Sequence, residues 1–338
     1  MKRLHRSLLV LAALVAAALV VAGCGGSDNK KSSSTATSTS ASESQVNLTA
    51  GKGLTIAMVT HGDGGSFWSV AKKGAEQAAK DEGVKLIYNE SNNDPQKQAQ
   101  MIEAAVSQKV DGLAVSAPNP DAIKGALAKA KAANIPIITL NSGADVYKEL
   151  GALTHVGQDE AIAGKAAGAK LKEEGAKKVL CIIHEQNNIG LNQRCAGAKQ
   201  GFGGAVDNLQ VKGTADIATT QTEIKSKLQA DKSYDAVLAL NPDIAVAAKG
   251  AIKGASSNAK LATFDLSPDV IKGIKAGDIL FAVDQQQYLQ GYLPVVFLTL
   301  YKTNANTIGG GQPVLTGPGF VDKSNAATVE KLAGEGTR

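Results

Sequence analysis

The sequence has no block of lysine or arginine residues. Its formal net charge is only +5, with 36 basic and 31 acidic residues. Three of the basic residues fall within the first 23 positions, so the remainder carries 33 basic against 31 acidic side chains, a net charge of +2. A nucleic-acid-binding surface requires clustered positive charge. We therefore expect no nucleic-acid partner.

Aromatic residues are also scarce. They make up 4% of the chain, with a single Trp, so the position of each one is informative. Trp68 lies beside Phe67 in the stretch VTHGDGGSFWSV (residues 59–70), directly after an apolar run and directly before a run of small residues. Two large aromatic side chains thus stand where a predicted strand has ended and a predicted helix begins.

Outside its N-terminus the sequence has only short runs of apolar residues. The run at about residues 8–22 is short for a membrane-spanning helix, which needs about 20 residues. It follows the basic segment MKRLHR and precedes VAGC, the arrangement of a secretory signal peptide. The ending Val-Ala-Gly-Cys resembles the lipobox of bacterial lipoproteins. That resemblance implies that residues 1–23 are removed and that Cys24 carries a diacylglyceryl group; a cleaved signal with an incidental cysteine is the alternative.

Residues 25–50 are rich in Ser, Thr and Ala and contain almost no large apolar side chains. Such a segment cannot bury enough surface to offset the entropy of ordering it. We predict that residues 24–53 are the lipidated cysteine and a flexible tether, and that the folded part begins at about Leu54. The expected location is the outer face of the cytoplasmic membrane, with the lipid as the only membrane contact.

Cysteine is rare as well, with three residues in the chain. Apart from Cys24, Cys181 lies in the predicted strand VLCII and Cys195 lies near the start of the next predicted helix. Export places both in an oxidising compartment. We predict a Cys181–Cys195 disulfide, with two buried free thiols as the alternative. Cys181 and His184 lack further ligands at metal-type spacing, so no metal site is expected.

Two enzyme signatures are incomplete. Gly62 and Gly64 follow a predicted strand as in the dinucleotide-binding GxGxxG motif, but Phe67 occupies the third glycine position, where a bulky residue prevents close helix–strand packing. No GxSxG stretch supplies a serine nucleophile for His61 or His184. We therefore expect no enzyme, no catalytic residue and no cofactor.

Short apolar runs alternate with Ala-rich amphipathic stretches along most of the folded part. LTIAMV is followed by SVAKKGAEQAAKDEG and then by VKLIYN. In the middle stretch Ala71, Ala75, Ala78 and Ala79 fall on one face of a helix. Strand–helix alternation of this kind predicts a parallel sheet covered by helices on both faces.

The pattern occurs twice. DGLAVSAPNPDAIKGAL begins at Asp111 and DAVLALNPDIAVAAKGAI begins at Asp235, and each reads as a buried strand, Asn-Pro-Asp and a helix. Further strand ends recur at matching distances before and after these starts: His61 and Asn141 for the first, His184 and Asp265 for the second. Three strands thus recur in register. We predict two similar Rossmann-like α/β lobes with parallel sheets.

Ligands of open α/β sheets bind beyond the carboxyl ends of the strands. The residues that follow the predicted strands are strongly polar: Asp63, Asn119, Asn141, Glu185, Asn187, Asn188, Asn192, Arg194, Asn241 and Asp265. Carboxylates accept hydrogen bonds, a guanidinium donates them and amides do both, which suits a neutral ligand with many hydroxyl groups. Phe67 and Trp68 then provide apolar walls for the C–H-rich face of a ring.

Residues 54–320 resemble the sugar-binding proteins of ABC importers, in the type I group similar to ribose-binding protein. The resemblance rests on an ordered set of motifs: SFW, NIPIITLN, HVGQDE, RCAGAKQGF, ALNPD, TFDLSPD and VDQQQYLQG. With the polar strand ends it gives the predicted ligand-binding set Asp63, Phe67, Trp68, Asn141, Gln158, Arg194, Asn241, Asp265 and Gln285. GGSFW stands where ribose binders usually have Asn-Pro before two Phe, and TLN replaces their commoner TLD, which argues against ribose itself.

Five members of this set have simpler alternatives. Trp68 could be ordinary core packing. Asp63 could only cap the helix that begins near Ser66, and Asn241 and Asp265 could only cap the helices that follow them. Arg194 could pair with Glu185 and never touch a ligand. These alternatives are open at the level of sequence.

The resemblance implies a type I periplasmic-binding-protein fold with a hinge that the chain crosses several times. We predict a first lobe at residues 54–157 plus 286–314 and a second at 158–285 plus 315–338. The function implied is that of a monomer that closes around a sugar or polyol and delivers it to an ABC transporter permease. A receptor for a small signalling molecule, similar to autoinducer-2 receptors, is the alternative. Regulators of related fold carry a DNA-binding motif where this chain has a signal peptide.

Overall fold

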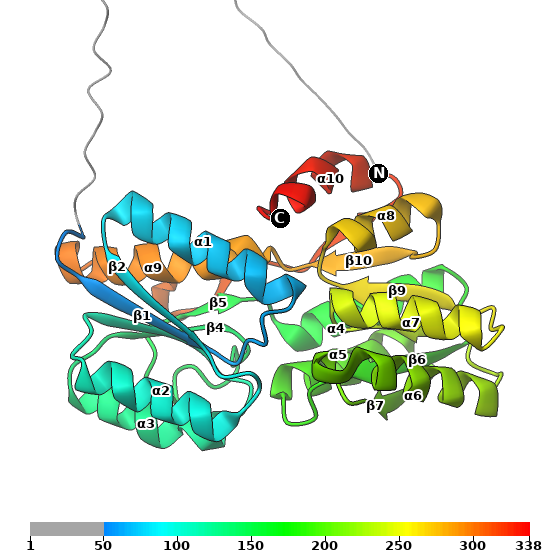
Figure 1. Ribbon diagram of the computed structural model, residues 1–338, viewed down its shortest axis with the longest axis horizontal. Helices are drawn as coiled ribbons and strands as arrows, with labels where there is room; N and C mark the ends of the chain where they lie inside the picture. The colour runs from blue at the N-terminus through cyan, green and yellow to red at the C-terminus, as the bar shows by residue number, and fades with distance from the viewer. Residues whose placement is uncertain (1–50) are drawn as a thin grey trace, which may run out of the picture. The chain divides into compact units, whose positions relative to one another are not determined.

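The computed structural model describes residues 51–338 (Figure 1). The predicted signal peptide, Cys24 and nearly all of the predicted tether lie outside the described residues. The described chain forms two six-stranded sheets, each covered by helices on both faces, as the alternation and the repeat predict. No helix among these residues combines the length and the apolarity needed to cross a membrane.

The first lobe is built on a parallel sheet with the strand order β11-β5-β4-β3-β1-β2. Its elements are β1 (Thr55–Thr60), α1 (Ser66–Glu82), β2 (Lys85–Glu90), α2 (Pro95–Ser107), β3 (Gly112–Ser116), α3 (Pro120–Ala132), β4 (Ile137–Asn141), β5 (His155–Gly157), α9 (Gln287–Asn304), the 3-10 turn η2 (Gly309–Gly311) and β11 (Val314–Leu315). Helices α1 and α9 pack on one face of the sheet, and α2 and α3 pack on the other.

The second lobe is built on the strand order β12-β10-β9-β8-β6-β7. Its elements are α4 (Glu160–Glu173), β6 (Lys178–Ile183), α5 (Ile189–Phe202), β7 (Ala205–Gln210), the 3-10 turn η1 (Thr214–Asp216), α6 (Ile217–Ala230), β8 (Ala236–Leu238), α7 (Pro242–Gly254), β9 (Lys260–Phe264), α8 (Pro268–Ala276), β10 (Phe281–Asp284), β12 (Gly319–Asp322) and α10 (Ala326–Glu335). The strands are parallel except β12, which runs antiparallel to β10.

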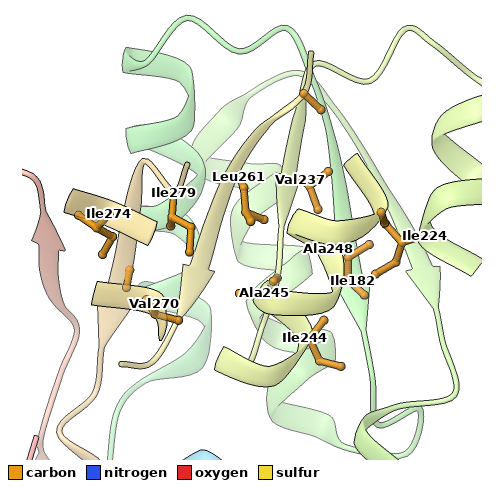
Figure 2. Packing of buried hydrophobic residues seen from close by; sticks show 14 of the residues in the cluster. Ile182, Ile224, Val237, Ile244, Ala245, Ala248, Leu261, Val270, Ile274 and Ile279 are labelled. Atoms are coloured by element: carbon orange, nitrogen blue, oxygen red, sulfur yellow. The ribbon is translucent and has the colours of Figure 1, made fainter. Parts of the chain in front are cut away.

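Each lobe has an apolar layer on either side of its sheet. Figure 2 shows the layer between the second sheet and helices α6, α7 and α8, where Ile182 and Val237 of the strands face Ile244 and Val270 of the helices. All four side chains are fully buried. Burial of an aliphatic side chain of this size contributes roughly 1.5–3 kcal/mol, so these layers hold the strand ends in fixed positions.

The two lobes use equivalent residues in the same way. Asp111 accepts a hydrogen bond from the amide of Thr55 at 2.8 Å, and Asp235 accepts one from the amide of Lys178 at 2.9 Å. Each aspartate therefore secures the start of a neighbouring strand, which explains why both repeats begin with this residue.

The chain crosses between the lobes three times: between β5 and α4, between β10 and α9, and between β11 and β12. Leu315 pairs with Gly157 in the first sheet. The third crossing therefore follows residue 315, one residue later than the sequence places it. Several crossings side by side form a hinge that permits opening while limiting its direction.

The second lobe contains a disulfide between Cys181 and Cys195, with an S–S distance of 2.01 Å. The bond joins β6 to α5 inside the buried cluster beneath helices α4 and α5. The two cysteines are 14 residues apart in sequence, for which the chain-entropy model gives roughly 3 kcal/mol of stabilisation. The enclosed loop contains His184, Glu185 and Arg194, so the bond also restrains a segment that lines the cleft described next.

Candidate ligand-binding cleft

An inner chamber of about 30 Å³ lies between the carboxyl ends of the two sheets. Seven of the nine predicted ligand residues line it: Phe67, Trp68, Asn141, Arg194, Asn241, Asp265 and Gln285. None of the seven is more than 9% exposed. The carboxyl ends of the two sheets thus bring together side chains that are up to 218 positions apart, from Phe67 to Gln285. This is the place where ligands of open α/β sheets bind.

The other two predicted residues lie beside the chamber and do not line it. Asp63 Oδ1 accepts from the amide of Gly65 at 3.0 Å, and its Oδ2 accepts from the hydroxyl of Thr214. Gln158 donates through Nε2 to Glu160 Oε2 at 2.9 Å. Both side chains therefore hold other protein groups.

Phe67 and Trp68 form the aromatic side of the chamber. They lie in the first turn of α1, with ring centroids 5.0 Å apart and planes at 79°, and His61 stands edge-on to Trp68 at 4.8 Å. The pair also belongs to the buried cluster that packs α1 and α9 on the first sheet. The aromatic side is therefore fixed by core packing on one face and available to a ring on the other.

A chain of carboxamides joins the two lobes behind the chamber. Asn141 ends β4 and Asp265 follows β9, and both have left-handed backbone, with φ of 60° and 67°, a conformation that Asn and Asp tolerate better than most residues. Gln285 Nε2 donates to Asp265 Oδ1 at 2.8 Å. Gln290 Nε2 donates to Gln285 Oε1 at 2.8 Å, and Asn141 Nδ2 donates to Gln290 Oε1 at 3.3 Å. The two equivalent strand ends are thus linked through the hinge.

Arg194 is held by Glu160. Its Nε and Nη2 donate to the two carboxylate oxygens at 2.5 and 2.8 Å, and its Nη1 donates to the carbonyl of Leu240 at 3.2 Å. The guanidinium also lies 4.6 Å from the ring centroid of Phe264. Burial alone would lower the pKa of Arg194, but the Glu160 carboxylate raises it above the ordinary value. The guanidinium is therefore charged, and its two bonds to Glu160 fix its orientation.

The Asp265 carboxyl faces this guanidinium inside the chamber. Burial raises the pKa of Asp265 to about 7, although the Arg194 charge and the bond from Gln285 oppose that rise. The group therefore changes charge near neutral pH. In its ionised form it accepts hydrogen bonds only, which suits a hydroxyl donor on a ligand.

Two histidines flank the chamber at equivalent strand ends. Burial lowers the pKa of His61 to about 3, and burial also lowers the pKa of His184. Both imidazoles are therefore neutral at pH 7. His61 Nδ1 lies 2.7 Å from Ser116 Oγ, and Glu185 lies between the two rings, 3.6 Å from His61 Nε2 and 3.9 Å from His184 Nε2.

Sequence reasoning missed Glu160 and Gln290, because both act through other side chains. Glu160 lies two positions after the predicted Gln158 in HVGQDE, but its partner Arg194 is 34 positions further along the chain, and no spacing rule links the two. Gln290 lies five residues after Gln285 in VDQQQYLQG, and no spacing rule marks it. The alternative pairing of Arg194 with Glu185 is wrong: the partner is Glu160, and Arg194 also lines the chamber.

A second cavity of about 770 Å³ lies outside the inner chamber. The two share His61, His184, Glu185 and Asn188 as lining residues. Both lobes contribute to the outer cavity, which makes it the mouth of the cleft. Its size falls within the range of small-molecule sites.

Comparison with known proteins defines the class. The family model for the periplasmic binding protein domain matches residues 56–304. The chain belongs to this family, whose members bind solutes and are not enzymes. Its two parallel-sheet lobes and the three hinge crossings are the type I form of the fold.

Three individual proteins show how similar the chain is to known sugar-binding proteins and transporters. A crystal structure of a carbohydrate transporter from Acidothermus cellulolyticus 11B in complex with myo-inositol is 48% identical, with a TM-score of 0.83, and the match covers 84% of this chain and 99% of that one. The ribose import binding protein of Haemophilus influenzae is 28% identical over 74% of this chain and 86% of its own length. The D-apiose import binding protein of Actinobacillus succinogenes is 27% identical over 82% and 91%.

Proposed function

We propose that this protein binds a sugar or a polyol between its lobes and delivers it to the permease of an ABC importer. The composition of the inner chamber carries the proposal: an aromatic pair, two carboxylates, one guanidinium and four carboxamides meet there. These groups recognise the apolar face and the hydroxyl edge of a ring. The relatives that are named for ribose, for D-apiose and for a myo-inositol complex support the same ligand class.

Each chamber residue has a task in this proposal. Phe67 and Trp68 pack against the apolar face of the ring, and Asp265 accepts a hydrogen bond from a hydroxyl group. Arg194 has five N–H donors, of which Glu160 and the Leu240 carbonyl take three, so two are available to ligand oxygens. The amides of Asn141, Asn241 and Gln285 both donate and accept.

Ligand entry requires the lobes to separate. The seven predicted ligand residues that line the chamber are at most 9% exposed, so a ligand the size of a sugar ring cannot reach them from solvent while the lobes are closed. A ring that contacts both lobes stabilises the closed arrangement relative to an open one. Hinge closure around the ligand is therefore the proposed binding mechanism.

A thermal-shift screen tests the ligand class. The protein is heated with pentoses, hexoses and polyols, including ribose and myo-inositol. A compound that binds the folded state stabilises it by RT ln(1 + [L]/Kd), about 2.7 kcal/mol at 100 times Kd. We expect at least one ring sugar or polyol to raise the melting temperature of wild type and to have no effect on Arg194→Ala. A panel without any hit would contradict the proposal.

We also propose that the mature chain begins at a lipidated Cys24 and is held on the outer face of the cytoplasmic membrane. The VAGC ending supports this, as does the Cys181–Cys195 disulfide, because such bonds persist in oxidising compartments. Mass spectrometry of the mature N-terminal peptide should find a diacylglyceryl group on Cys24. Cys24→Ser should release the protein from membranes, and an unmodified N-terminus in wild type would refute the anchor.

A further inference from the structure

We propose that Asp243 is a positioning residue for lobe closure: from the second lobe it caps α1, the first-lobe helix that carries Phe67 and Trp68. Together with Asp63, Ser66 and Thr214 it forms a latch across the cleft, outside the ligand chamber. The inference rests on the proposed function, since it concerns how a bound ligand is retained.

Helix α1 has no side-chain cap from its own lobe. Its N-cap residue is Gly65, which has no side chain to accept the first free amides. Asp243 takes that role from the second lobe: its Oδ2 accepts from the amide of Ser66 at 3.2 Å, and its Oδ1 accepts from the hydroxyl of Ser66 at 2.5 Å. A carboxylate at a helix N-terminus is also favoured by the helix dipole.

A reciprocal contact runs in the other direction. Asp63 of the first lobe accepts from the hydroxyl of Thr214 in the second. Gly65 lies between the two carboxylates, since a Cβ at this position would be 2.9 Å from Asp243 Oδ2 and 3.0 Å from Asp63 Oδ1. Each lobe thus gives one carboxylate to one hydroxyl of the other, and glycine permits their approach.

The latch lies apart from the ligand. None of its four residues lines the inner chamber, whereas Asp63, Thr214 and Asp243 line the outer cavity. Because the latch contacts join different lobes, they are lost when the lobes separate. They therefore add to the free energy that favours the closed arrangement, and a larger closed fraction tightens the apparent affinity.

The internal repeat supplies a matched control. Asn119-Pro120-Asp121 and Asn241-Pro242-Asp243 are equivalent motifs, and both asparagines cap the helix that follows. Asp121, however, pairs with Lys124 at 2.7 Å on an exposed face of its own helix. The same motif position therefore makes a local ion pair in one lobe and an interlobe contact in the other.

The experiment compares Asp243→Ala and Asp243→Asn with Asp121→Ala. Dissociation constants are measured by calorimetry with the compound that binds wild type best, dissociation rates by stopped-flow Trp fluorescence, and melting temperatures without ligand. Charge-assisted hydrogen bonds predict that Asp243→Ala weakens binding roughly ten-fold or more, mainly through faster dissociation, with a smaller effect for Asp243→Asn. The ligand-free melting temperature should change no more than in Asp121→Ala.

Ser66→Ala provides a second variant from the opposite lobe. In a double-mutant cycle with Asp243→Ala, the two losses in affinity should be clearly less than additive, because both remove one contact. Full additivity, or affinity of Asp243→Ala equal to that of Asp121→Ala, would overturn the latch while the proposed function stands. A wild-type protein that binds none of the sugars and polyols would overturn the proposed function and the latch with it.

Discussion

Asp265 is buried, with 2% of the residue exposed. It lines the inner chamber together with Arg194, and its carboxyl group accepts one hydrogen bond from Gln285. Its pKa in the folded protein is about 7, above the ordinary value of 3.8, so the folded state retains a proton that the unfolded chain has released. The stability that this difference contributes is fully present below about pH 4. It is lost as the pH rises to about 7.

Asp265→Asn should therefore stabilise the ligand-free protein above pH 7, by an amount that shrinks toward pH 4. Asparagine keeps the shape, can accept from Gln285 and tolerates the left-handed backbone, as Asn141 does at the equivalent strand end. Linkage sets an upper bound of about 4 kcal/mol on the gain. Calorimetric melts across this range measure it, and a difference that does not vary with pH would show that this carboxyl is not the titrating group.

Most residues that line the inner chamber could be predicted from the sequence, but the residues that hold their side chains in place could not. Asn141, Asn241 and Asp265 end strands or cap helices in a recurring pattern, so their meeting at one cleft follows from the place where α/β sheets bind ligands, beyond the carboxyl ends of their strands. Glu160 in α4 instead orients Arg194 in α5, and Gln290 in α9 joins Gln285 to Asn141, which lies 149 positions before Gln290 in the chain. No spacing within one element encodes such a contact, because it depends on how the helices pack.

At the scale of elements, the alanine face of α1 was predicted correctly, but its partner was not. Ala71, Ala75 and Ala78 are fully buried, and the helix they face is α9, which lies more than 200 positions further along the chain. Gly74 and Gly291 let the two helix backbones touch: a Cβ on Gly291 would lie far inside contact distance of the Ala71 carbonyl. Helical periodicity predicts which face is buried but not what buries it.

Gly291→Ala should therefore destabilise the protein, by about 1–3 kcal/mol or more, because a backbone carbonyl blocks the added methyl group. Gly125→Ala in α3 is the matched control, since nothing lies within 4 Å of its Cβ position. There the higher helix propensity of alanine should stabilise by about 0.5–1 kcal/mol. Urea unfolding of both variants gives the comparison, and equal effects at the two sites would argue against close packing of α1 on α9.

At the scale of the whole molecule, the repeat made the two-lobed fold predictable. Three strands in each half recur at matching distances. Only a few architectures are compatible with buried strands that alternate with amphipathic helices. The antiparallel strand β12 and the exact third crossing were not predictable. The elements there, β11 and β12, are only 2 and 4 residues long, too short for a periodic pattern.

Fluorescence of Trp68 tests the central claim most directly, because it is the only tryptophan in the chain and it lines the inner chamber beside Phe67. Titration with myo-inositol and with each sugar or polyol that raises the melting temperature should produce a saturable change in intensity or wavelength. The same titration of Asp265→Ala, which keeps Trp68 but removes the hydroxyl acceptor, should give no saturable change. A ligand that stabilises wild type while leaving the Trp68 spectrum unchanged at saturation would place binding elsewhere and contradict the account.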